Sequence, residues 1–229
     1  MASRVLAVCA LLLAASTHPA PATQQQEVGM SDRNPLAQLI EPINADVARM
    51  IRDPATRVER LDTPFLLQGL IFRVDWRGPY KPVTLTIGYA RRDNLTVLLP
   101  LNHEGFQELV ARAGVALDTD ENRVSLAVTE LETTRRFDET FVALRSFRDL
   151  RLMANPTPAD EQRFRAIEQQ YGPLIELPRT AGNGPWTLPI YVLSRDELCL
   201  FTVTLDAAGG STIAKTVLEA DTPLLPAAS

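Results

Sequence analysis

The stretch TLPIYVLSRDELCLFTVTLDAAGGSTIAKTVLE, residues 187–219, decides the fold class. Three segments in it are dense in aliphatic, aromatic and threonine residues, the composition of β-strands. These segments are 187–193, 197–205 and 212–219. The adjacent glycines Gly209 and Gly210 lie between the second and third segments, and such a pair favours a tight hairpin turn. The sequence therefore predicts an antiparallel meander at this end of the chain.

A second group of strand-like segments lies nearer the other end of the chain. Its members are residues 66–76, 83–91 and 95–99. The breaks between them carry Gly78-Pro79 and Asp93-Asn94, which are turn-forming pairs. We therefore expect a second antiparallel meander, and the two meanders form either two sheets or one continuous sheet.

Helical patterns lie before, between and after these strands. Apolar residues recur at helical spacing over residues 36–51, where Pro42 predicts either a kink or two segments. Three further helices are expected. The first covers residues 104–112, with Asn102 as its N-terminal cap and Gly114 at its end, and the last covers residues 158–171, with Thr157 as its cap. Between them, residues 137–150 are expected to be helical because of the spacing of Phe137, Phe141, Leu144, Phe147 and Leu150. The predicted fold class is α+β, with antiparallel β meanders covered by helices.

Residues 118–122, DTDEN, resemble the start of a calcium-binding loop. A loop of the EF-hand type needs glycine at its sixth position and a carboxylate at its twelfth, where this chain has Arg123 and Thr129. The apolar residues of 124–129 alternate with small or polar ones, which favours a strand. We therefore expect 118–122 to be a turn between a helix and a strand, without a bound metal.

The first residues have the pattern of a secretory signal peptide. Arg4 precedes an apolar run, and Ala20-Pro21-Ala22 supplies small residues for cleavage. We expect a signal peptide over 1–22 and a secreted or periplasmic protein with no integral membrane segment after cleavage. A lipid anchor on Cys9 is the less favoured alternative, because bulky Val8 precedes this cysteine.

The rest of the chain divides by composition. Residues 23–34 are polar and are predicted to form a flexible leader. Residues 35–226 are predicted to form a single α+β domain, with two subdomains, 35–135 and 136–226, as the alternative. Once the signal peptide is removed, Cys199 is the last cysteine, so no internal disulfide is expected and the thiol is predicted to be buried and inert.

Charge and motifs exclude several classes of protein. The net charge is −5 at pH 7 and no basic tract is present, so nucleic acid is not an expected partner. Dinucleotide and P-loop fingerprints are absent, and we expect no cofactor. His103 next to Glu104 lacks the second histidine of an HExxH zinc helix, because position 107 is Gln. No catalytic residue is assigned, although Glu130 and Glu132 belong to the carboxylates that a hydrolase could use.

The strongest candidates for contact with a ligand or partner are aromatic residues in glycine- and proline-rich loops. The loop RTAGNGPWTLP, residues 179–189, offers Arg179, Asn183 and Trp186, and Trp76 with Tyr80 has the same character. Each tryptophan could instead fill the core. The leading hypothesis is a non-enzymatic module that binds an unknown protein or small ligand. The alternative is a hydrolase that uses carboxylates or His103 in a cleft.

Overall fold

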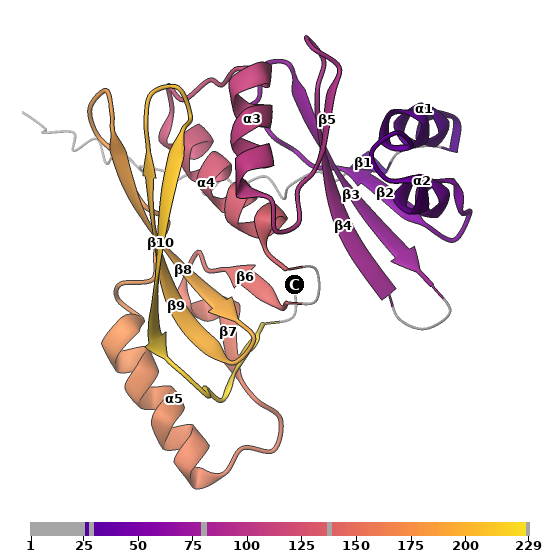
Figure 1. Ribbon diagram of the computed structural model, residues 1–229. Helices are drawn as coiled ribbons and strands as arrows, with labels where there is room; N and C mark the ends of the chain where they lie inside the picture. Colours follow the sequence, from indigo (N-terminus) through magenta and orange to yellow (C-terminus); the bar gives the residue numbers. More distant parts are fainter. Residues whose placement is uncertain (1–25, 28–29, 79–81, 137–138, 228–229) are drawn as a thin grey trace, which may run out of the picture.

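The computed structural model describes residues 26–27, 30–78, 82–136 and 139–227, and these residues form an α+β fold. Its elements form alternating layers of helix and sheet (Figure 1). Helices α1 and α2 cover one face of an N-terminal sheet, whose other face packs on α3 and α4. A C-terminal sheet packs on the far side of α3 and α4, and α5 covers its outer face. The two sheets therefore share one helical layer.

The N-terminal sheet is an antiparallel meander, as predicted. Its strands are β2 (Arg57–Arg60), β3 (Gly69–Arg77), β4 (Pro82–Ala90) and β5 (Leu95–Leu98), with β1 (Gln26–Glu27) paired to β2. The predicted segments 66–76, 83–91 and 95–99 correspond to β3, β4 and β5. A Cβ on Gly88 of β4 would lie 2.5 Å from Leu109 Cδ2, so a larger residue here would displace the Leu109 side chain of the helix that packs on the sheet.

The region around Pro42 forms two helices, which confirms one of the two alternatives. They are α1 (Met30–Ile40) and α2 (Ala45–Arg52). Asn44 caps α2, since its Oδ1 accepts hydrogen bonds from the backbone N–H groups of Asp46 and Val47. Helix α1 begins at Met30, inside the predicted leader and before the expected domain start at residue 35.

The helical layer between the sheets consists of α3 (His103–Ala113) and α4 (Asp120–Thr134). Helix α3 has the predicted caps, Asn102 and Gly114. The predicted strand 124–129 is wrong, because these residues lie within α4, which begins at the cap Thr119. Helix α4 is packed between two sheets, so its apolar residues do not follow a one-sided helical pattern.

The C-terminal sheet has the strand order β10-β9-β8-β6. Its strands are β6 (Phe141–Ala143), β8 (Trp186–Ser194), β9 (Glu197–Leu205) and β10 (Ser211–Glu219). The three segments of 187–219 therefore form the predicted meander, with Gly209 in the turn at φ 87°. Leu188, Ile190 and Val192 of β8 pack toward the helical layer, and Tyr191 and Leu193 pack with α5 (Pro158–Tyr171). This alternation is the period of two expected for a sheet covered on both faces.

The predicted helix over 137–150 is wrong. Within the described part of this range, the chain forms β6, a 3₁₀ turn (Phe147–Asp149) and the start of β7 (Leu150–Leu152), which pairs with β11 (Leu224–Pro226). Phe141 packs edge-on against Phe201 of β9, and Phe147 against Phe164 of α5. The aromatic residues that mimic a helical period thus contact different elements. Phe137 itself lies outside the described residues.

Candidate functional site

Trp186 lies in the core, which corrects the expectation of an exposed contact residue. Its side chain is in the cluster shared by both sheets, and the residue is 6% exposed. The indole N–H donates to the carbonyl of Gly182 at 3.1 Å, and the Arg123 guanidinium lies 4.3 Å from the ring centroid. Strand β8 begins at Trp186, so the predicted loop 179–189 is shorter than expected. Arg179 and Asn183 lie in the remaining loop and are exposed.

The calcium-like run forms the N-terminus of α4 and holds this loop in place. Asp120 Oδ1 accepts hydrogen bonds from the backbone N–H and the hydroxyl of Thr180, and it forms an ion pair with Arg123 at 2.9 Å. The hydrogen bond from Thr180 is the main reason that the pKa of Asp120 is lowered. The aspartate therefore joins the start of α4 to the loop.

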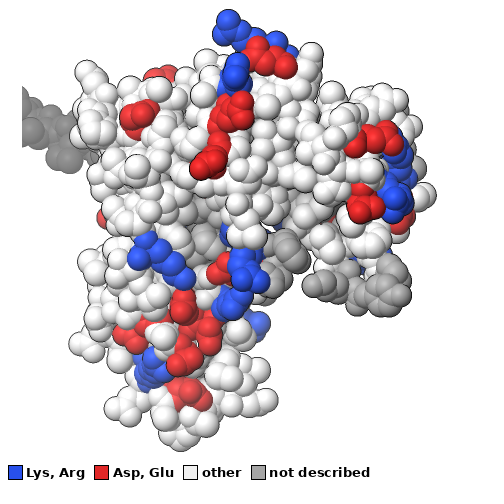
Figure 2. Space-filling model, in the orientation of Figure 1, with Lys and Arg blue, Asp and Glu red and all other residues white. Residues whose placement is uncertain are grey.

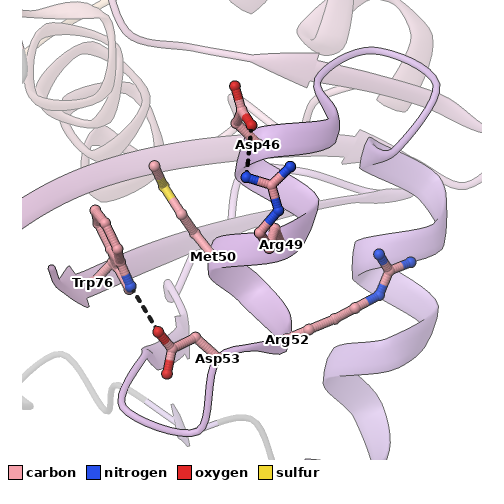
Figure 3. A pocket seen from close by; sticks show the side chains of 6 residues that line it. All are labelled: Asp46, Arg49, Met50, Arg52, Asp53 and Trp76. Atoms are coloured by element: carbon pink, nitrogen blue, oxygen red, sulfur yellow. Dashed lines mark hydrogen bonds and ion pairs between the residues drawn. The ribbon is translucent and has the colours of Figure 1, made fainter.

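Trp76 borders a shallow pocket of about 500 Å³ between α2 and β3 (Figure 3). Its indole N–H donates to Asp53 Oδ2 at 2.9 Å, which lowers the pKa of Asp53. Asp46 pairs with Arg49 at 3.0 Å, and Arg52 pairs with Glu41 outside the pocket. These charged groups are thus partnered by the protein itself. Tyr80, predicted to act with Trp76, lies outside the described residues.

A second hollow, of about 460 Å³, lies where α4 ends beside the C-terminal sheet. We call it the His103 groove. Its apolar side chains are Leu101, Leu131, Phe141, Phe201 and Ile213, and its polar and charged ones are His103, Thr134, Arg135, Arg136, Glu139 and Lys215. Figure 2 shows Lys and Arg side chains in the region where the helical layer meets the C-terminal sheet. The arginine and lysine side chains outnumber the one carboxylate of the lining, Glu139. An apolar surface with such a border suits a ligand with an apolar body and an anionic end.

The cationic side chains of the groove are held by neighbouring groups. Arg135 donates hydrogen bonds to the backbone carbonyls of Glu132 at 3.1 Å, of Arg136 at 3.3 Å and of Glu139. Lys215 Nζ lies 2.9 Å from Glu197 Oε2, and this hydrogen bond raises the pKa of Lys215. Because these contacts limit side-chain freedom, a ligand would meet charges already placed at the groove.

At the wall of the groove, His103 is paired with a buried carboxylate. His103 Nδ1 lies 2.9 Å from Glu130 Oε1, and the two side chains are 44% and 0% exposed. Gln107 Nε2 donates to the same Oε1 at 2.6 Å and to Ser211 Oγ at 3.0 Å. The Ser211 backbone N–H returns a hydrogen bond to Gln107 Oε1. This network joins α3, α4 and β10 behind the groove.

Burial raises the pKa of Glu130, although hydrogen bonds from Ser211 and Gln107 and the neighbouring His103 act in the opposite direction. Its second oxygen, Oε2, is buried and makes no hydrogen bond to the rest of the described protein. A buried carboxylate with one unpartnered oxygen favours the protonated form. The electrostatics of the pair therefore depend on a proton.

The candidate carboxylates Glu130 and Glu132 are not brought together by the fold. Both lie in α4, where residues two apart point in different directions, so Glu130 is buried and Glu132 is exposed. The sequence drew attention to His103, but its partner could be recognised only from the packing of α3 against α4.

The predicted burial of Cys199 is confirmed. The residue is 0% exposed on β9, and burial raises the pKa of its thiol to about 11. Such a thiol is almost entirely protonated near neutral pH, so it lacks the thiolate that a nucleophile needs. Cys199 is therefore not a candidate nucleophile for the neighbouring groove.

No family model, curated protein or solved structure matches the chain. Within the described ranges, no group of three or more His, Cys, Asp or Glu side chains could hold a metal ion, and no helix has the length and apolar character needed to cross a membrane.

Proposed function

We propose that the chain is an exported, secreted or periplasmic protein that binds a small ligand with an apolar body and an anionic group. The observation that carries this proposal is the His103 groove, which combines the aromatic pair Phe141 and Phe201 with the cationic side chains of Arg135 and Lys215. The proposal keeps the binding module expected from the sequence and places its ligand at the groove. Export is supported by the pattern of residues 1–22 alone.

Decanoate is a suitable probe because it joins a flexible apolar chain to a carboxylate. Decanol has the same chain without the charge and serves as the matched control. Isothermal titration calorimetry should show saturable binding of decanoate and a weaker affinity for decanol. The difference should be about 10- to 100-fold if one charge-assisted hydrogen bond, of about 1.5–3 kcal/mol, is lost.

Two variants locate the site. Lys215→Gln should weaken decanoate binding, since it removes a cation of the groove. Arg165→Gln removes a cation from α5, where the side chain is 77% exposed and lies outside the groove lining, and it should leave binding unchanged. Absence of saturable decanoate binding would refute the proposed ligand class. Equal losses in the two variants would place the ligand elsewhere.

Contact with a partner protein remains a separate proposal for the loop that holds Arg179 and Asn183. Both residues are exposed, and the hydrogen bonds between Thr180 and Asp120 fix the start of the loop. An anchored loop with exposed polar groups loses little conformational freedom on binding, which favours recognition.

The hydrolase alternative is favoured by one observation, the pairing of His103 with Glu130. A buried carboxylate that holds Nδ1 of a histidine leaves Nε2 to act as a general base. In ester hydrolysis Nε2 would take a proton from water while the oxygen attacks the acyl carbon. The acyl C–O bond would then break, and the imidazolium would return the proton to the leaving alkoxide. Equal rates of p-nitrophenyl acetate hydrolysis by the native chain and His103→Gln would exclude this role.

A further inference from the structure

We infer that the His103 groove takes up its anionic ligand together with one proton, which the His103–Glu130 pair holds. The inference rests on the proposed function and states how ligand binding at that site is regulated. It predicts that the affinity for the anionic ligand falls as the pH rises and the pair loses its proton. Bound ligand should in turn raise the pH at which the pair loses that proton.

The geometry gives the imidazole two different environments. Nδ1 faces the buried carboxylate of Glu130 at 2.9 Å, while the ring lines the groove and is nearly half exposed. Nε2 is therefore the ring nitrogen left for a ligand. When the ring is protonated, both nitrogens are donors, so one can hold Glu130 and the other the ligand anion.

The net charge of the pair decides whether an anion is attracted. With one shared proton, the pair is either imidazolium with carboxylate or imidazole with carboxylic acid, and its net charge is zero. After the proton is lost, the pair has a net charge of −1 beside the groove. Because Glu130 is fully buried, its charge is poorly screened by solvent. An incoming anion therefore favours the protonated pair and is repelled by the deprotonated one.

The other charged groups around His103 come from every neighbouring element. They are Glu104 on α3, Arg135 and Arg136 after α4, Glu139 before β6, and Lys215 on β10. Desolvation lowers the pKa of Arg135 and raises the pKa of Glu132, which lies three residues before it at the end of α4. The contribution of the pair is therefore the part of the pH dependence that His103→Gln removes.

Proton NMR can follow His103 directly in the full chain. The sequence holds two histidines, so the His103 signal is identified by its absence from His103→Gln. The imidazole Cε1–H shift is recorded against pH with and without saturating decanoate. Bound decanoate should raise the midpoint by about one pH unit, as expected for an opposite charge close to a titrating group. By linkage, decanoate affinity should fall about tenfold across the same pH range.

Two substitutions test whether the partner matters. Glu130→Gln keeps the size and the hydrogen bond with Gln107 but removes the charge, so the His103 midpoint should fall. Glu104→Gln removes a carboxylate from an exposed neighbour on the same helix and should change the midpoint by less than half as much. If Glu130→Gln does not fold, the test remains in His103→Gln, which should flatten the dependence of decanoate affinity on pH.

The outcomes separate this inference from the proposed function. Saturable decanoate binding with an unchanged His103 midpoint overturns proton coupling and leaves the binding site intact. An equal midpoint in the native chain and folded Glu130→Gln also overturns the coupling. Absence of decanoate binding at every pH overturns both proposals. Both proposals are supported if decanoate raises the His103 midpoint in the native chain, and if Lys215→Gln loses both this rise and the affinity for decanoate.

Discussion

Trp186→Ala gives the sharpest test of the fold, because it distinguishes a core residue from a contact residue. Removing a large buried aromatic side chain typically costs about 3–5 kcal/mol of unfolding free energy. The structure favours the upper half of that range. The ring is 6% exposed, its N–H is bonded to the Gly182 carbonyl, and the Arg123 guanidinium stacks over it. Trp186→Ala removes these interactions together with the apolar packing of the ring.

Urea denaturation followed by circular dichroism suits this variant, because substitution removes one of the two tryptophans that fluorescence would report. The slope of free energy against urea should stay the same while the midpoint falls. In thermal unfolding, Tm should fall by about 10 °C, since each kcal/mol shifts a domain of this size by about 2–4 °C. Trp186→Phe keeps a ring but loses the N–H, so it should lie between the native chain and the alanine variant.

Trp76→Ala provides the comparison, because Trp76 is only partly buried and has its own indole hydrogen bond to Asp53. It should cost clearly less than Trp186→Ala. A loss below about 1 kcal/mol for Trp186→Ala would refute the reasoning, because that is the range of ordinary surface substitutions and small packing changes. Such a small loss of unfolding free energy would indicate that the Trp186 side chain is exposed.

The remaining predictions concern single measurable properties. Cys199→Ala should lose about 1–2 kcal/mol of unfolding free energy, and the native thiol should react with a thiol reagent only on unfolding; rapid stoichiometric labelling would contradict its burial. The pKa of Glu130 is raised in the folded protein, so the protonated carboxyl stabilises the fold below the unfolded pKa near 4.5, and this stability is lost as the pH rises through the folded pKa. In Glu130→Gln the free energy of unfolding should therefore depend less on pH above pH 4.5. The same pH dependence in the native chain and the variant would count against this account. Intact-mass analysis of the exported form should show a chain that starts at Thr23, and a lipid-modified mass that starts at Cys9 would contradict this.

The elements that could be predicted from the sequence have local signals at their ends. Helix α5 carries Thr157, Pro158 and Asp160 at its start, and the first and last of these form the observed capping box. The C-terminal meander can be predicted because its strands are rich in aliphatic, aromatic and threonine residues and its last turn contains Gly209. In such cases local preference and tertiary packing require the same conformation.

The errors arise where tertiary contacts replace a one-sided pattern. Helix α4 buries residues against both sheets, so Val124, Leu126 and Val128 suggest a strand although Thr119 caps a helix. Strand β2 was missed because it is short and its sequence, RVER, has a single apolar residue. The partner of His103 could not be predicted either, since the distance between two helices depends on the packed core and not on the sequence interval.

Glu130 and Glu59 show why the pair at the groove calls for a functional explanation. Both residues are almost fully buried, and burying an unpaired carboxylate is unfavourable. Glu59 forms an ion pair with Arg57, whose guanidinium keeps its charge at every physiological pH. Glu130 is paired with His103, which is a cationic partner only when its imidazole is protonated. If the carboxylate were needed only to join α3 to α4, a permanent cation or a neutral amide would serve at all pH values. A histidine makes the charge of the buried pair depend on pH next to a groove bordered by arginine and lysine, and this is the property that proton-linked capture of an anion requires.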